Sequence, residues 1–174
     1  MKKNSLLIAL SILINGFVSA QTTFNITIER TANIGDSLIT GIISVNGEPI
    51  GKTYENKDSL VKADKYRGLM RYYSQRGFVT GPFGTIGNIG DFLLEIDSAY
   101  SQTGRIKTNV LFHCGFLPKH SKGCIWLGAV SGPKSARFIA DDHALRKLRL
   151  KFYGTETPNS CPNLKIMIEI IDSF

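Results

Sequence analysis

Apolar and polar residues alternate along much of the chain, and this pattern predicts a domain built mainly from β-strands. Alternation places the apolar side chains on one face of a strand and the polar ones on the other. Many of the apolar positions carry β-branched residues, which favour strands. The predicted strands cover residues 24–28, 38–45, 49–54, 68–74, 92–96, 109–112 and 164–171.

A tight hairpin is predicted between the second and third of these strands. Asn46-Gly47 separates them, and both residue types adopt the positive φ of a two-residue β-turn. The polar residues 55–65 predict a loop. Residues 77–90 contain five glycines and a proline, which predicts a longer irregular segment.

One segment, residues 135–152, has the apolar spacing of an amphipathic helix. Its apolar positions are Phe138, Ile139, Leu145, Leu148 and Phe152. Ser135 and Asp141 are both suitable N-cap residues, and Gly154 suits the end. No linker or repeat interrupts the pattern. We therefore predict one mainly β (α+β) domain with a single helix near the C-terminus.

The first twenty residues have the pattern of an export signal. A basic start, Met1-Lys2-Lys3, precedes an almost entirely apolar run from Leu6 to Val18, and the segment ends at Ala20. This predicts a signal peptide, residues 1–20, cleaved after Ala20. The alternative is an N-terminal anchor, but the run is shorter than the roughly 20 residues that span a bilayer. We expect a periplasmic or secreted domain, residues 21–174, without stable membrane insertion.

Composition and charge restrict the classes of partner that the protein is expected to bind. With 43% hydrophobic residues the chain is too apolar for a disordered protein. Removing the signal would leave 154 of 174 residues and a charge of +5 instead of +7, because it holds two basic residues and no acidic one. An exported domain rarely meets nucleic acid, so none is expected. The positive charge suits binding to an anionic envelope surface. Alternatively, it serves only to keep the domain soluble.

The residues that carry chemistry gather in one short stretch. Two of the three histidines and two of the three cysteines lie between residues 113 and 124. An imidazole that takes the proton of a thiol creates a nucleophile for acyl transfer. Gly123 leaves the backbone beside Cys124 open to a substrate, and the N–H groups of both residues are candidates to face an oxyanion.

Strand geometry suggests which cysteine acts. If residues 110–114 form a strand, His113 and Cys114 point to opposite faces, so a site built on His113 would admit Cys124. Cys114 is then left to pair with Cys161, and we hypothesise a Cys114–Cys161 disulfide with Cys124 free. One alternative is a Cys114–Cys124 disulfide, which leaves no nucleophile.

A zinc site is the other alternative, formed by the two histidines and two cysteines of this stretch. Their spacing fits no familiar ligand pattern, so neither a metal nor another cofactor is expected. His120 belongs to a predicted loop, where it is either solvated or a contact for substrate. Trp126 alternates with Cys124 and either lines the face of the thiol or packs in the core.

His113-Cys114-Gly115 followed by Ser121-Lys122-Gly123-Cys124 resembles the His-x-Gly and Ser-x-Gly-Cys signature of L,D-transpeptidase (YkuD-like) catalytic domains. The resemblance implies a β-sandwich or open barrel in which Cys124 attacks a peptidoglycan stem peptide and His113 is the base. Gly123 and Cys124 would form the oxyanion hole, and Ser121 would order the turn. Trp126 stands where that family usually has an Arg, whose charge Lys122 or Lys119 could replace. We expect Lys122 and Trp126 to contact the substrate.

A compact variant of this motif, with Gly-Cys-Ile-Leu-x-Gly after His-x-Gly-Asn, occurs in a poorly characterised family of small domains. The chain resembles it at residues 123–128, Gly-Cys-Ile-Trp-Leu-Gly, although Phe116 replaces the Asn. Similar stretches upstream are residues 28–30, 35–38 and 53–56. Together they extend the resemblance over most of residues 24–171.

These patterns favour an exported cysteine acyl-transfer enzyme, a monomer of the L,D-transpeptidase or L,D-carboxypeptidase type, with a peptidoglycan peptide as its partner. Two alternatives remain open. One is a non-catalytic binding or structural protein of the envelope on the same scaffold. The other is a secreted toxin directed at a competitor's wall, which would use the same chemistry.

Overall fold

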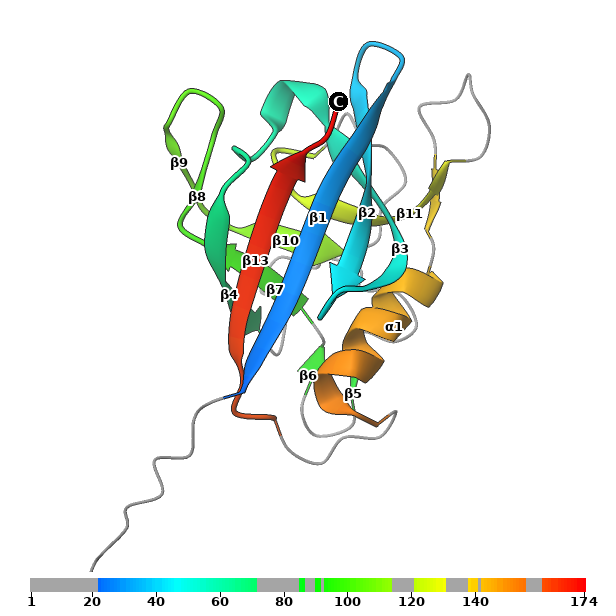
Figure 1. Ribbon diagram of the computed structural model, residues 1–174, viewed down its shortest axis with the longest axis vertical. Helices are drawn as coiled ribbons and strands as arrows, with labels where there is room; N and C mark the ends of the chain where they lie inside the picture. The colour runs from blue at the N-terminus through cyan, green and yellow to red at the C-terminus, as the bar shows by residue number, and fades with distance from the viewer. Residues whose placement is uncertain are drawn as a thin grey trace, which may run out of the picture.

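Eight strands close into a β-barrel in the part of the chain that the computed structural model describes, and one helix packs beside them (Figure 1). The described residues are 22–71, 85–86, 90–91, 93–113, 121–130, 138–140, 142–155 and 161–174. The predicted signal peptide lies outside them. The barrel strands are β1 (Thr23–Ile34), β2 (Leu38–Val45), β3 (Glu48–Asn56), β4 (Lys65–Arg71), β7 (Leu93–Asp97), β10 (Val110–His113), β11 (Ile125–Val130) and β13 (Lys165–Asp172).

The remaining elements are short. They are the 3₁₀ turn η1 (Lys57–Ser59), the strand β12 (Phe138–Ala140), the helix α1 (Asp142–Tyr153), and two small hairpins, β5–β6 (Thr85–Ile86 and Gly90–Asp91) and β8–β9 (Ala99–Tyr100 and Ile106–Lys107). None of the helices among the described residues is long and apolar enough to cross a membrane.

The barrel order is β10-β7-β4-β13-β1-β2-β3-β11, and a further pairing joins β10 to β11. The β1–β13 and β10–β11 pairs are parallel, and the other pairs in the ring are antiparallel. The mainly β prediction with one helix near the C-terminus is confirmed. The expected sandwich or open barrel is corrected, because the β10–β11 pairing closes the sheet on itself.

Side chains that alternate along each strand fill the barrel. In β1, Phe24, Ile26 and Ile28 are buried in the core, whereas the residues between them face outward. The helix α1 lies at the end of the barrel where β2 ends and β3 begins (Figure 1). Its buried positions include Ala144, and Gly51 of β3 leaves room for that side chain.

The predicted elements agree with the structure where local signals are strong. The strand predicted at 38–45 is β2, and Asn46 and Gly47 have φ values of 49° and 85° in the hairpin turn. Gly154, at φ 71°, follows α1 and its N–H donates to the Leu150 carbonyl. The strand predicted at 68–74 begins earlier, at Lys65. The predicted loop at 77–90 lies largely outside the described residues.

The helix prediction is wrong at its beginning. Phe138 and Ile139 lie in β12, which pairs with Val130 and Ala129 of β11, and α1 starts only at Asp142. The exposed edge of β11 offers ladder hydrogen bonds that override the helical spacing of these two residues. The candidate caps at positions 135 and 141 lie outside the described residues.

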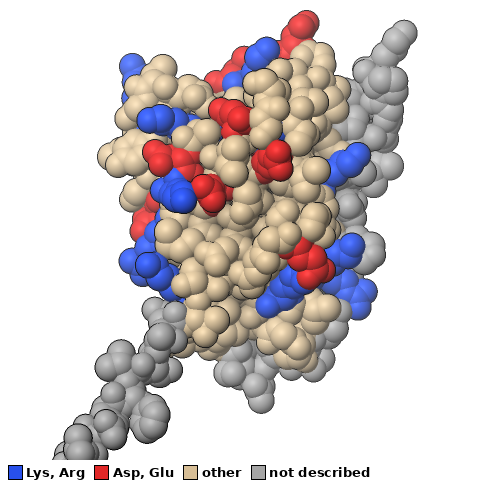
Figure 2. Space-filling model, viewed as in Figure 1, with Lys and Arg blue, Asp and Glu red and all other residues tan. Residues whose placement is uncertain are grey.

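Charged side chains of both signs are interspersed on the face formed by β13, β1 and β2 (Figure 2). One of the exposed pairs there joins Lys65 to Glu169 at 3.3 Å. This face therefore carries no continuous basic surface, although the chain has a net charge of +7.

Candidate functional site

The strand pairing that closes the barrel brings the predicted histidine and cysteine to one face. Phe112 of β10 lies opposite Ile125 of β11, and His113 lies opposite Trp126. Phe112 and Ile125 point into the core, so His113 and Cys124 share the other face. By this register they are two residues apart along neighbouring strands, about 8 Å between Cα atoms. The register therefore brings both residues to the same side of the β10–β11 pair.

A small apolar cluster surrounds the thiol on this face. Its members are Leu38, Tyr54, Leu111, Cys124 and Trp126, with Ile34 packed against them. The ring centroids of Trp126 and His113 are 5.8 Å apart. Trp126 is thus on the face of the thiol and is also buried, so its two interpretations from the sequence are compatible. A contact between Trp126 and substrate stays a prediction.

Ser121 organises the turn that carries Cys124. Its Oγ accepts a hydrogen bond from the Gly123 N–H at 3.2 Å and donates to the Cys124 carbonyl at 2.9 Å. The Ser121 carbonyl accepts from Asn56 Nδ2 at 3.1 Å and from Ser59 Oγ at 2.8 Å. The end of β3 and the turn η1 therefore hold this segment in place, as the predicted ordering role of Ser121 requires.

Gly123 departs from its predicted role. Its N–H is committed to Ser121 Oγ and does not point to an oxyanion in this conformation. The residue has φ 124°, a left-handed value that favours glycine. The backbone conformation of the turn thus requires a glycine at this position. The expected oxyanion hole of two N–H donors lacks the Gly123 N–H.

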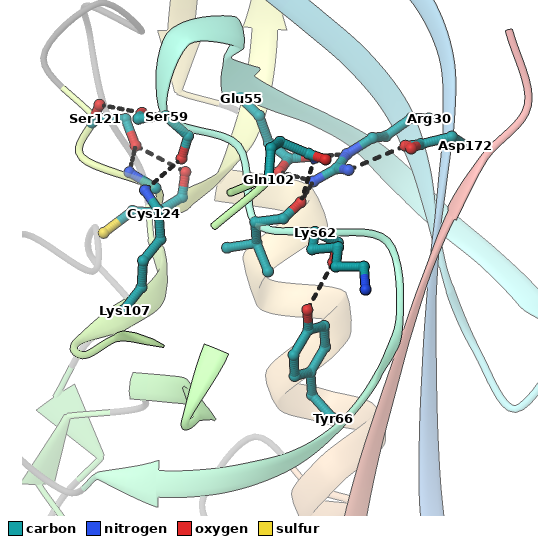
Figure 3. Close-up of polar contacts among 12 residues, drawn as sticks. Arg30, Glu55, Ser59, Lys62, Tyr66, Gln102, Lys107, Ser121, Cys124 and Asp172 are labelled. Atoms are coloured by element: carbon teal, nitrogen blue, oxygen red, sulfur yellow. Dashed lines mark hydrogen bonds and ion pairs between the residues drawn. The ribbon is translucent and has the colours of Figure 1, made fainter. Parts of the chain in front are cut away.

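Lys107 belongs to the same site, although the sequence did not single it out. Its Nζ donates to the Ser59 carbonyl at 2.8 Å and to the Lys122 carbonyl at 3.0 Å. Figure 3 shows this lysine beside Cys124, at the junction of β9, η1 and the 121–124 segment. Burial lowers the pKa of Lys107, and the nearby Cys124 raises it. The side chain of Lys122, a predicted substrate contact, is exposed.

Burial is the main influence on the acidity of the Cys124 thiol. Burial raises the pKa of Cys124, which the Leu111 N–H and Lys107 lower and Glu95 raises further. The Sγ lies 3.7 Å from the Asn109 carbonyl, to which it donates. Asn109 in turn donates its N–H to Glu95 at 3.0 Å. A chain of contacts therefore joins the thiol to a buried carboxylate.

The predicted Cys114–Cys161 disulfide is not present, because Cys161 is a free and exposed thiol. Strands β7 and β4 separate β10 from β13, which puts the end of β10 about 14 Å from the start of β13 at the usual strand spacing. A disulfide needs Cα atoms within about 7 Å. Cys114 itself lies outside the described residues, and Cys124 is free as expected.

The zinc alternative is only partly within the described residues, since His120 and Cys114 lie outside them. Among the residues that are described, no three or more His, Cys, Asp or Glu side chains are grouped to hold a metal ion.

The sequence missed four members of the site, Lys107, Ser59, Asn56 and Asn109, which lie 12 to 65 positions before Ser121. They carry no shared spacing, and only the closure of the barrel brings them to Cys124. Comparison of the chain with protein-family models, curated proteins and solved structures finds no match in any of the three.

Proposed function

We propose that the protein is an exported cysteine acyl-transfer enzyme of the L,D-transpeptidase or L,D-carboxypeptidase type, acting on peptidoglycan stem peptides. The observation that carries the proposal is the shared face of His113 and Cys124, set by the β10–β11 register. The resemblance of their sequence context to the L,D-transpeptidase signature supplies the substrate class. The described part of the chain is mainly β, as the resemblance implies, but its sheet is closed where a sandwich or open barrel was expected.

In the proposed reaction, His113 takes the proton of Cys124, and the thiolate attacks a peptide carbonyl carbon. The tetrahedral intermediate collapses with cleavage of the C–N bond, and the leaving amine takes the proton from His113. A thioester on Cys124 remains. A second amine resolves it in transpeptidation, and water resolves it in carboxypeptidation. Burial raises the pKa of the resting thiol, so the proposed mechanism needs His113 to take its proton.

The test is a covalent adduct. The protein is incubated with a carbapenem or a peptidoglycan tetrapeptide, and its mass is measured intact and after digestion. We expect an adduct on the peptide that contains Cys124, its loss in Cys124→Ala, and its retention in Cys161→Ala, because Cys161 is a free thiol away from the site. An adduct that survives in Cys124→Ala would refute the mechanism.

A second candidate, a non-catalytic envelope binding protein, is favoured by the burial of Cys124, which is 9% exposed. A nucleophile needs access to its substrate, and a buried thiol whose pKa is raised by that burial suits a structural role. This alternative predicts that the protein sediments with purified peptidoglycan but forms no adduct. A secreted toxin would share the adduct and would differ in the wall that it attacks.

A further inference from the structure

The ammonium of Lys107 is held at a fixed position next to the thiol. Two of its three N–H donors bond to the carbonyls of Ser59 and Lys122, at 2.8 and 3.0 Å. An ammonium has three N–H donors, and the third has no acceptor among the described residues. Because the two carbonyls belong to different segments, η1 and the 121–124 turn, the ammonium cannot swing away without losing both contacts.

Gly123 makes this approach possible. A Cβ on Gly123 would lie 3.0 Å from Lys107 Nζ, 3.4 Å from its Cδ and 3.1 Å from the Ser59 carbonyl oxygen. The lysine therefore packs against the backbone of the residue that precedes the cysteine. The charges of the pair also act on each other, since Lys107 lowers the pKa of Cys124 and Cys124 raises the pKa of Lys107.

The site has a need for such a cation. The Gly123 N–H, which a simple two-amide oxyanion hole would use, already donates to Ser121 Oγ. A buried thiolate also requires a counter-ion, because a charge without one is strongly disfavoured away from water. Lys107 is the described cation whose ammonium lies against this turn.

We propose that Lys107 is the charge-stabilising residue of this site, serving as counter-ion to the Cys124 thiolate and as hydrogen-bond donor to the oxyanion that follows it. The role of Lys107 as counter-ion to the Cys124 thiolate does not depend on the substrate of the protein. The oxyanion part rests on the proposed acyl transfer.

The step balances without any proton from the lysine. An electron pair of the Cys124 sulfur forms the S–C bond, and the carbonyl π pair moves to oxygen, so one negative charge passes from sulfur to oxygen. Lys107 stays protonated and keeps its donor on that charge. When the pair returns to the carbonyl, the C–N bond breaks and the amine leaves with the proton that His113 took from the thiol.

The test is the pH dependence of Cys124 alkylation by iodoacetamide. Trypsin separates the three cysteines, because lysines lie between them in the sequence, so the rate at Cys124 is read from its own peptide. The variants are Lys107→Gln, which is neutral but still donates hydrogen bonds, Lys107→Arg, which keeps the charge, and Lys57→Met, which removes an exposed lysine. Lys107→Met repeats the loss of charge with a different shape.

We expect Lys107→Gln and Lys107→Met to move the midpoint of the pH profile upward, with a rate at pH 8 about tenfold lower, as loss of a neighbouring opposite charge implies. Lys107→Arg and Lys57→Met should keep the wild-type midpoint. If one neutral variant has lost its fold, its Cys124 is alkylated at the rate measured for the wild-type protein in urea. The other neutral variant then provides the test.

An unchanged midpoint in the folded neutral variants would overturn the proposal, and so would an equal shift in Lys107→Arg, which would mean that Lys107 only tethers the loops. Failure of the acyl-transfer function is seen separately, as absence of an adduct in the wild-type protein. In that case the alkylation profile still reports on the Lys107–Cys124 pair.

Discussion

Arg30 and Glu55 form a bidentate ion pair inside the barrel, with Nε to Oε1 at 2.9 Å and Nη2 to Oε2 at 2.7 Å. Arg30 continues the inward positions of β1 and is completely buried. Asp172 and the Val61 carbonyl accept its remaining contacts at 3.0 and 2.8 Å. Glu55 lies near the end of β3, directly before η1. The ion pair therefore anchors the strand end that leads into η1, the turn that contacts the site (Figure 3).

Removing the buried cation should destabilise the protein strongly. In Arg30→Met, Glu55 remains buried without its partner, and breaking such a pair costs about 3–5 kcal/mol. Urea unfolding monitored by circular dichroism gives the free energy of unfolding. The control is Lys65→Met, which breaks the exposed pair with Glu169 and should cost below about 1 kcal/mol. Equal effects of the two substitutions would contradict a buried, interior position for Arg30.

The close contact between α1 and β3 leaves no room for an added methyl group at Gly51. A Cβ on Gly51 would lie 2.6 Å from the Cβ of Ala144, so Gly51→Ala forces the helix away from the strand at a cost of about 1–3 kcal/mol. Ala144→Gly removes the opposing methyl. In a double-mutant cycle the combined variant should lose less stability than the two single losses together. Additive losses would mean that the two positions do not touch.

Loss of the Ser121 hydroxyl should loosen the turn before Cys124. Ser121→Ala removes the acceptor of the Gly123 N–H and the donor to the Cys124 carbonyl, which together are worth about 1–3 kcal/mol. Hydrogen exchange of the Gly123 amide should accelerate in parallel with the drop in unfolding free energy. Ser173→Ala, at an exposed position, is the control and should change neither quantity.

The sequence was sufficient for elements whose signals are local. The strand at 38–45 needs only its apolar and β-branched run, and the Asn46-Gly47 turn needs only residues that tolerate positive φ. The face shared by His113 and Cys124 also follows from alternation. These features depend on neighbours in the chain, and the structure places them as expected.

Features set by tertiary pairing could not be predicted in this way. The two residues Phe138 and Ile139 fit a helix by spacing, but a free edge of β11 made them a strand. Lys107 is one of 21 basic residues, and it becomes part of the site only because its hairpin lies over η1. Arg30 sits at an inward position of β1, where alternation alone would lead one to expect an apolar residue.

The three cysteines provide a direct comparison of sequence-based and structural predictions. In the structure Cys161 is free and exposed, whereas Cys124 is free and buried. Because burial raises the pKa of Cys124, its thiolate fraction at pH 8 is below that of an exposed thiol, and the reagent also reaches it less easily. We therefore expect iodoacetamide to label Cys161 at least about tenfold faster than Cys124 in the unreduced native protein.

Raising the pH from neutral into the alkaline range should accelerate the labelling of Cys124, since burial raises the pKa of its thiol and the thiolate therefore forms at higher pH. In urea the two rates should converge, and Cys161→Ser should remove the fast phase. The disulfide hypothesis from the sequence predicts the opposite result, with Cys161 unreactive even in urea until a reductant is added. Site-resolved mass spectrometry of the three cysteine peptides separates these outcomes in a single time course.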